Sequence, residues 1–246
     1  MNLIKRAATA SLLALTFSVA GAAAQNDAPP KTVEQIKSTL QARYPKLQVE
    51  QVHKGPVPGL YEVMTNAEII YTNETAELVF AGRVVNTKTQ EDVTAKRWNE
   101  LNAVDFASLP FDLAIKTVRG DGSRKIAVFS DPLCPYCREL EQQMEGITNV
   151  TIYTFLYPLE TGHPGAGKKA NSLWCSSDRA AAWSSWMLQQ TEPKEATCEG
   201  SPVSALAALG DKLHINSTPT VFLANGQRSS GAVPRADLEK LLTARR

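Results

Sequence analysis

Two cysteines with two residues between them, Cys134 and Cys137, follow a short β-like run from Lys125 to Ser130. An amphipathic run from Leu140 to Ile147 comes next, so the pair stands where a helix is predicted to begin. Unpaired backbone N–H groups and the positive end of the helix dipole favour a thiolate there, and the thiolate is the form that attacks disulfides. Cys137, one turn further along, can reach Cys134. The pattern predicts a redox-active dithiol, with half of a zinc site or a purely structural pair as the alternatives.

The first 24 residues indicate export. Lys5 and Arg6 precede an apolar stretch from Ala7 to Ala20, and three alanines, 22–24, offer small residues for cleavage. This pattern is typical of a secretory signal peptide, and the alternative is a retained N-terminal anchor. The mature chain is predicted to begin near Gln25, leaving roughly 220 residues, enough for one large or two small domains.

Export changes how the other two cysteines, Cys175 and Cys198, are interpreted. The total of four is even, which in an oxidising compartment indicates pairing. With the close pair assigned to redox chemistry, we expect Cys175 and Cys198 to form a structural disulfide. Closing this loop stabilises the fold by roughly 3 kcal/mol in the chain-entropy model. A four-cysteine zinc site is the rival interpretation, but such sites usually contain two closely spaced pairs.

The charge balance and the three histidines give no sign of a nucleic acid, membrane or metal as a partner. The chain has 26 Lys and Arg against 25 Asp and Glu, and removing Lys5 and Arg6 leaves 24 against 25. Nothing in this balance favours nucleic acid or an anionic membrane as a partner. The three histidines are scattered without ligand spacing, so we predict neither a metal nor a cofactor. Asp131, between the strand and Pro132, could tune the cysteines or serve as a turn residue.

The mature chain divides into two domains and a connector. Residues 25–88 predict a short helix, with Thr32 to Gln35 as its capping box, followed by a small strand meander. This unit makes a marginal core, which is completed either by a partner subunit or by packing on its own chain. Residues 89–109 predict a partly exposed linker helix. Residues 110–246 alternate strands and helices, beginning with a strand over Phe111 to Val118, which predicts an α/β domain with a mixed sheet.

Three motifs together resemble the DsbC/DsbG family of periplasmic thiol:disulfide interchange proteins. They are Phe129-Ser130-Asp131 before Cys134-Pro135-Tyr136-Cys137, Trp174-Cys175 with Cys198, and Ser217-Thr218-Pro219-Thr220 before a strand. The resemblance covers residues 30 to 243. It implies an α+β N-terminal dimerisation domain, a connecting helix and a catalytic domain of thioredoxin fold, assembled as a V-shaped homodimer in the periplasm.

The resemblance also implies roles for residues around the dithiol. Cys134 would be the nucleophile and Cys137 the resolving cysteine, with Pro135 and Tyr136 tuning the redox potential. Thr218 and a cis Pro219 would form the edge that binds a client peptide. The dithiol would be kept reduced by a membrane thiol-relay protein of the DsbD kind.

The expected function is isomerisation or reduction of incorrect disulfides in misfolded exported proteins, with chaperone-like client binding. Pro-Tyr between the cysteines is typical of DsbG, whereas Gly-Tyr is commoner in the isomerases. A DsbG-like reductase that protects single sulfenylated cysteines is therefore one alternative. A chaperone-like binding module whose dithiol is secondary is an alternative from another class.

Overall fold

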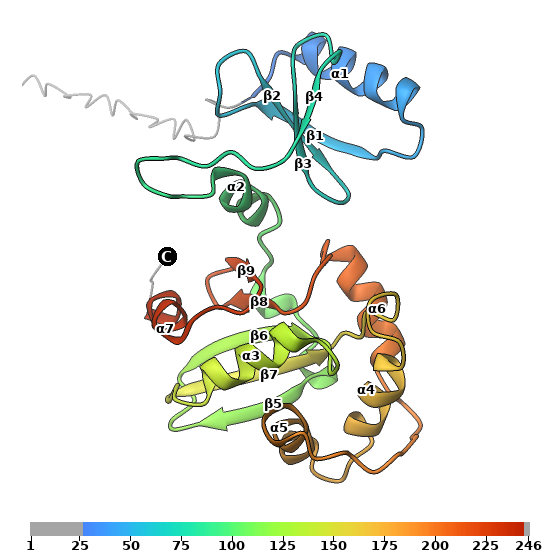
Figure 1. Cartoon of the computed structure of the whole chain (residues 1–246), viewed down its shortest axis with the longest axis vertical. Coiled ribbons are helices and arrows are strands. Elements are labelled where there is room, and N and C mark those ends of the chain that lie inside the picture. The colour runs from blue at the N-terminus through green and yellow to red at the C-terminus, as the bar shows by residue number, and fades with distance from the viewer. Residues whose placement is uncertain (1–26, 244–246) are drawn as a thin grey trace, which may run out of the picture.

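The computed structural model describes residues 27–243, and the expected signal peptide at residues 1–24 lies outside them. The N-terminal unit contains one helix and a four-stranded antiparallel sheet in the order β1-β2-β3-β4 (Figure 1). Its elements are α1 (Pro30–Arg43), β1 (Val49–Lys54), β2 (Tyr61–Thr65), β3 (Ile69–Thr72) and β4 (Val79–Ala81).

Helix α1 packs its apolar face on this sheet. Ile36 and Leu40 are fully buried there in a small core with Val63. The predicted capping by Thr32 is wrong, because the helix begins earlier, at Pro30, whose fixed φ suits the first helical position. Thr32 lies inside the helix, and its hydroxyl donates to Glu74 Oε1 at 3.2 Å.

The connecting helix α2 (Val93–Leu101) is tied to the N-terminal sheet. Its Arg97 pairs with the buried carboxylate of Glu62 at 2.9 Å, and the hydroxyls of Thr94 and Tyr71 lie 2.7 Å apart. After the helix, a 3-10 turn (Phe106–Ser108) places Phe106 in the core of the C-terminal domain. The connector therefore packs against both units.

The C-terminal domain is built on a five-stranded mixed sheet in the order β5-β7-β6-β8-β9. Only β6 and β7 are parallel, and the other neighbours are antiparallel. The strands are β5 (Ile115–Arg119), β6 (Arg124–Ser130), β7 (Val150–Leu156), β8 (Thr220–Leu223) and β9 (Arg228–Ser230). The helices are α3 (Pro135–Met144), α4 (Ala166–Trp174), α5 (Arg179–Gln189), α6 (Val203–Lys212) and α7 (Arg235–Thr243).

The first predicted strand of this domain begins later than expected. Phe111–Leu113 forms a 3-10 turn, and β5 begins at Ile115. The Phe111 ring packs on Tyr153 of β7, with centroids 4.2 Å apart. Packing of this partly buried ring against the aromatic core, together with the turn that Pro110 opens, explains why the segment does not extend the sheet.

Both faces of this sheet are covered. Along β6, Ala127 and Phe129 face a core shared with helices α4, α5 and α6, while Ile126 and Val128 face a core shared with α3 and α7. This alternation follows the period of two in a strand. Figure 1 shows α3 lying across the sheet, with α4 and α6 at one end, α7 at the other and α5 beside β5. The central strand β6 is thus held rigidly where it delivers the cysteines.

The two domains contact each other directly. The Asn216 side-chain amide donates to the carbonyl of Ala67 at 2.8 Å, and His214 Nε2 lies 3.8 Å from Glu50 Oε1 of β1. Both Asn216 and His214 belong to the segment just before β8. Among residues 27–243, no helix has the length and apolarity needed to cross a membrane.

Candidate functional site

The dithiol stands at the junction of β6 and α3. The strand ends at Ser130, and Cys134 is the N-cap of the helix that Pro135 opens. The backbone N–H of Cys134 donates to the carbonyl of Asp131 at 3.2 Å, which closes the intervening turn. Cys137 follows in the first helical turn. The placement of the two cysteines relative to the strand and the helix is the one that the sequence predicts.

Both cysteines are free thiols and both are buried, Cys134 with 5% exposure and Cys137 with none. The Cys134 thiol donates to the carbonyl oxygen of Thr218 at 3.4 Å. The backbone N–H of Asp131 donates to the Cys137 sulfur at 3.3 Å. The Thr218–Pro219 peptide bond is cis. The structure therefore brings the Thr218–Pro219 segment, 84 residues away in the chain, against the first cysteine.

The pKa values of the two thiols are shifted in opposite directions. The hydrogen bond from Cys137 is the main cause that lowers the pKa of Cys134 to about 5, and the Thr218 side chain and two backbone N–H groups act in the same direction against the cost of burial. Burial is the main cause that raises the pKa of Cys137, and its hydrogen bond to Cys134 adds to it. Near neutral pH, Cys134 is a thiolate and Cys137 keeps its proton.

The Thr218 hydroxyl has a role that only the tertiary structure shows. Its oxygen is buried and has no hydrogen-bond partner among the residues that the structure describes. A buried hydroxyl without a partner is costly unless another state of the molecule uses it. The adjacent thiolate of Cys134 is an acceptor that this hydroxyl can serve.

Asp131 organises the turn through its side chain. It is fully buried, and its Oδ1 accepts the backbone N–H of Leu133 at 2.7 Å. Its Oδ2 accepts the N–H of Leu159 and contacts His163 Nδ1, at 2.7 and 2.9 Å. These hydrogen bonds confirm the prediction that Asp131 is a turn residue. His163 was not predicted, because its 32-residue separation from Asp131 leaves no signal in the sequence.

Both residues between the cysteines are exposed. Pro135 occupies the first helical position, and Tyr136 is 62% exposed. The turn is also braced by Trp186, whose indole N–H donates to the carbonyl of Pro132 at 2.6 Å. The Arg138 guanidinium lies 5.7 Å from the centroid of the same Trp186 ring. An aromatic side chain is therefore presented to solvent directly beside the dithiol.

The other two cysteines form a disulfide. Cys175 caps the C-terminus of α4, and Cys198 lies in the long loop before α6. The bond ties that loop to the helical side of the core, where Cys175 packs.

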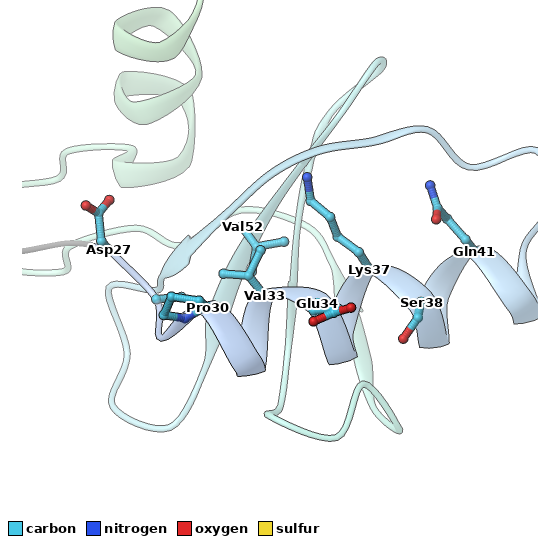
Figure 2. A pocket seen from close by; sticks show the side chains of 9 residues that line it. Asp27, Pro30, Val33, Glu34, Lys37, Ser38, Gln41 and Val52 are labelled. Carbon is cyan, nitrogen blue, oxygen red and sulfur yellow. The ribbon is translucent and has the colours of Figure 1, made fainter.

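A shallow hollow elsewhere has no part in this chemistry. It encloses about 650 Å³ between α1 and β1, where Val33 and Val52 lie side by side and Glu34 and Lys37 project from the helix (Figure 2). None of its lining residues belongs to the dithiol or its supporting turn. Within the described part of the chain, no group of three or more His, Cys, Asp or Glu side chains is arranged to hold a metal ion.

The comparisons with known proteins agree with this geometry. Residues 111–246 match the family model of a thioredoxin-like domain, and residues 20–95 match that of the disulfide bond isomerase N-terminal domain. The class is therefore that of thioredoxin-fold thiol:disulfide oxidoreductases. The chain belongs to the DsbC family of thiol:disulfide interchange proteins.

Individual relatives support the assignment. The chain is 40% identical over 215 residues to a probable thiol:disulfide interchange protein DsbC of Bordetella pertussis, covering 87% of this chain and 76% of that protein. It is 25% identical over 196 residues to DsbC of Escherichia coli K12, covering 78% and 80%. The solved disulfide interchange protein from Neisseria gonorrhoeae matches at 44% identity and a TM-score of 0.53, covering 55% of this chain and 96% of that one. These matches do not favour the DsbG-like or the chaperone alternative.

Proposed function

We propose that Cys134 is the nucleophile of this enzyme and Cys137 its resolving thiol. The observation that carries the assignment is the placement of the two sulfurs: Cys134 is the N-cap of α3, where a thiolate is favoured, whereas Cys137 is completely buried. The pKa of Cys134 is accordingly lowered and that of Cys137 raised, and only a thiolate attacks a disulfide. A low thiol pKa also makes Cys134 a good leaving group when it is displaced. The pair is therefore suited to form mixed disulfides quickly and to release them.

The reaction begins with Cys134 as a thiolate and Cys137 as a thiol. The Cys134 thiolate attacks one sulfur of a client disulfide, so that a Cys134–client disulfide forms, the client's own S–S bond breaks and a client thiolate leaves. In isomerisation, a client thiolate attacks the client sulfur of the mixed disulfide, so that a new client disulfide forms, the Cys134–client bond breaks and Cys134 leaves as a thiolate. In reduction, Cys137 loses its proton to the departing client thiolate and attacks Cys134, which leaves the enzyme oxidised and the client reduced.

Thr218 and Pro219 serve as the edge beside which the client strand lies. Support comes from the contact between the Thr218 carbonyl and the Cys134 thiol, which places this backbone at the reacting sulfur. Pro135 and Tyr136 tune the redox potential through the turn that opens α3. Cys175 and Cys198 act structurally.

The protein works in an oxidising compartment and depends on an external reductant. Residues 1–24 act as a signal peptide that directs the chain to the periplasm, where the clients are misfolded exported proteins with incorrect disulfides. Isomerisation needs the dithiol reduced, and in an oxidising compartment a membrane thiol-relay reductase of the DsbD kind supplies the electrons. The domain limits are those of the sequence interpretation: 25–88, 89–109 and 110–246.

The protein acts as a homodimer through its N-terminal domain. Support comes from the edge strand β4, where Val79 is 41% and Phe80 52% exposed, and from the neighbouring Leu78 at 60%. Exposed apolar residues on an unpaired sheet edge form a template for pairing with another chain. A second copy of the same edge covers both the apolar side chains and the free backbone groups.

Refolding of scrambled ribonuclease tests the enzymatic assignment. The wild-type protein should restore activity, Cys134→Ala should restore none above background, and Cys137→Ala should retain isomerisation but accumulate mixed disulfides. Full rescue by Cys134→Ala would refute the role of this thiol and leave only client binding.

A further inference from the structure

The ion pair behind the dithiol has no part in the reaction described above. Asp131 is fully buried, and three donors converge on its carboxylate: two backbone N–H groups and the ring of His163. Its own backbone contacts both halves of the dithiol, through the Cys134 N–H and the Cys137 sulfur. A carboxylate held by several donors is fixed in position, and so is the group that it binds.

His163 reaches this site from the loop after β7. Its Nδ1 lies 2.9 Å from Asp131 Oδ2, and the side chain keeps 26% exposure. Since the carboxylate only accepts, Nδ1 carries a proton. The hydrogen bond to Asp131 is the main cause that raises the pKa of His163, and the negative charges of Asp131 and Cys134 act in the same direction.

Coupling between two charged groups is reciprocal. If the Cys134 thiolate favours the protonated ring, then the protonated ring favours the thiolate by the same free energy. The charged groups that act on the ring are Asp131 and Cys134. The carboxylate of Glu160, in the same loop as His163, accepts the backbone N–H groups of Gly165 and Gly167 instead, at 2.9 and 2.5 Å.

We propose that His163, held by the buried carboxylate of Asp131, is a positioning residue of the dithiol whose positive charge favours the thiolate form of Cys134 over the thiol. Asp131 alone would place an uncompensated negative charge beside the nucleophile. The imidazolium of His163 compensates the negative charge of Asp131, and the carboxylate still accepts the backbone N–H groups that hold the turn. The inference rests on the proposed role of Cys134 as the nucleophile.

Removal of this charge has a measurable consequence. A partly exposed cation beside a thiolate shifts its pKa by about half a unit to one unit. With the Cys134 pKa at about 5, His163→Gln should lower the thiolate fraction at pH 5 by about two- to fivefold and leave it unchanged at pH 8. His163→Arg keeps the charge and should reproduce the wild-type profile at pH 5.

The experiment measures alkylation of the reduced mature protein by iodoacetamide between pH 3.5 and 8, with mass spectrometry to assign the modified sulfur. His53→Gln, which removes a histidine of β1 in the other domain, is the matched control and should titrate as wild type. Thermal unfolding of each variant reports on folding independently.

Three results would overturn the proposal: an unchanged midpoint in His163→Gln, equal shifts in the Gln and Arg variants, or a shift in His53→Gln as large as that in His163→Gln. Equal shifts would mean that the ring acts by packing rather than by charge. Failure of the underlying assignment is distinguishable, because iodoacetamide would then modify Cys137 rather than Cys134 in the wild-type protein.

Discussion

The buried hydroxyl of Thr218 offers a direct test of how this fold acidifies its nucleophile. Its oxygen has no partner among the described residues, yet it lies beside the Cys134 sulfur and lowers the pKa of that thiol. Thr218→Val removes the hydroxyl and keeps the shape of the side chain. The carbonyl of Thr218, which accepts from the thiol form, remains in place.

The magnitude follows from the strength of a hydrogen bond to a charged group, about 1.5–3 kcal/mol. One pKa unit corresponds to about 1.4 kcal/mol, so the variant should titrate about one to two units higher. The midpoint for Cys134 should therefore move from about 5 to about 6–7. At pH 5 the thiolate fraction should fall by about five- to fiftyfold, while at pH 9 it should not change.

The sign of the pH dependence is fixed by the direction of the shift. The pKa of Cys134 is lowered from its ordinary value of 9.0, so the thiolate stabilises the reduced folded protein. This stabilisation is complete above the ordinary value and is lost as the pH falls through about 5. Acidification from neutral pH through about 5 should therefore lower the free energy of unfolding of the reduced protein.

Absorbance of the thiolate at 240 nm, followed against pH in the reduced protein, measures the midpoint directly. Thr151→Val is the matched control, because this threonine is also buried in the catalytic domain and its hydroxyl bonds to the Gly122 carbonyl instead. Equal midpoints for Thr218→Val and wild type would refute the reasoning, as would a wild-type midpoint above 8.

Two further predictions concern stability and assembly. Replacing Cys175 and Cys198 by serine should lower the free energy of unfolding by roughly 3 kcal/mol in urea denaturation, because the loop they close gains chain entropy when unfolded; an unchanged value would show that the bond is not structural. Phe80→Asp places a charge on the exposed β4 edge and should convert the dimer to a monomer in sedimentation, whereas Val118→Asp, a similarly exposed position on edge strand β5, should not; dimers in both variants would exclude this edge as the interface.

Local patterns were sufficient for most of the elements. The strand, turn and helix around the cysteines follow from a buried apolar run, a proline at the helix start and an amphipathic face. Helix α7 begins at Arg235, directly after Pro234, whose fixed φ suits the start of a helix. These signals lie within a few residues of the element that they determine.

The errors arose where a distant contact outweighs a local preference. Thr32 has the spacing of a helix cap, but the observed N-cap is Pro29, three residues earlier, and the Thr32 hydroxyl bonds to Glu74 from another part of the fold. Phe111 has the character of a strand residue, but its partly buried ring packs on Phe106 and Tyr153. Neither partner is visible from the neighbouring sequence.

By itself, the sequence determined the chemistry of this protein. Two cysteines at the start of a helix indicate a redox-active dithiol, because a helix N-terminus favours a thiolate. Only the tertiary structure decided which groups act on that thiolate. The mixed sheet brings Thr218 from before β8, and the loop after β7 carries His163 to the buried Asp131. Such contacts depend on how the strands are ordered in space, and no spacing along the chain records that order.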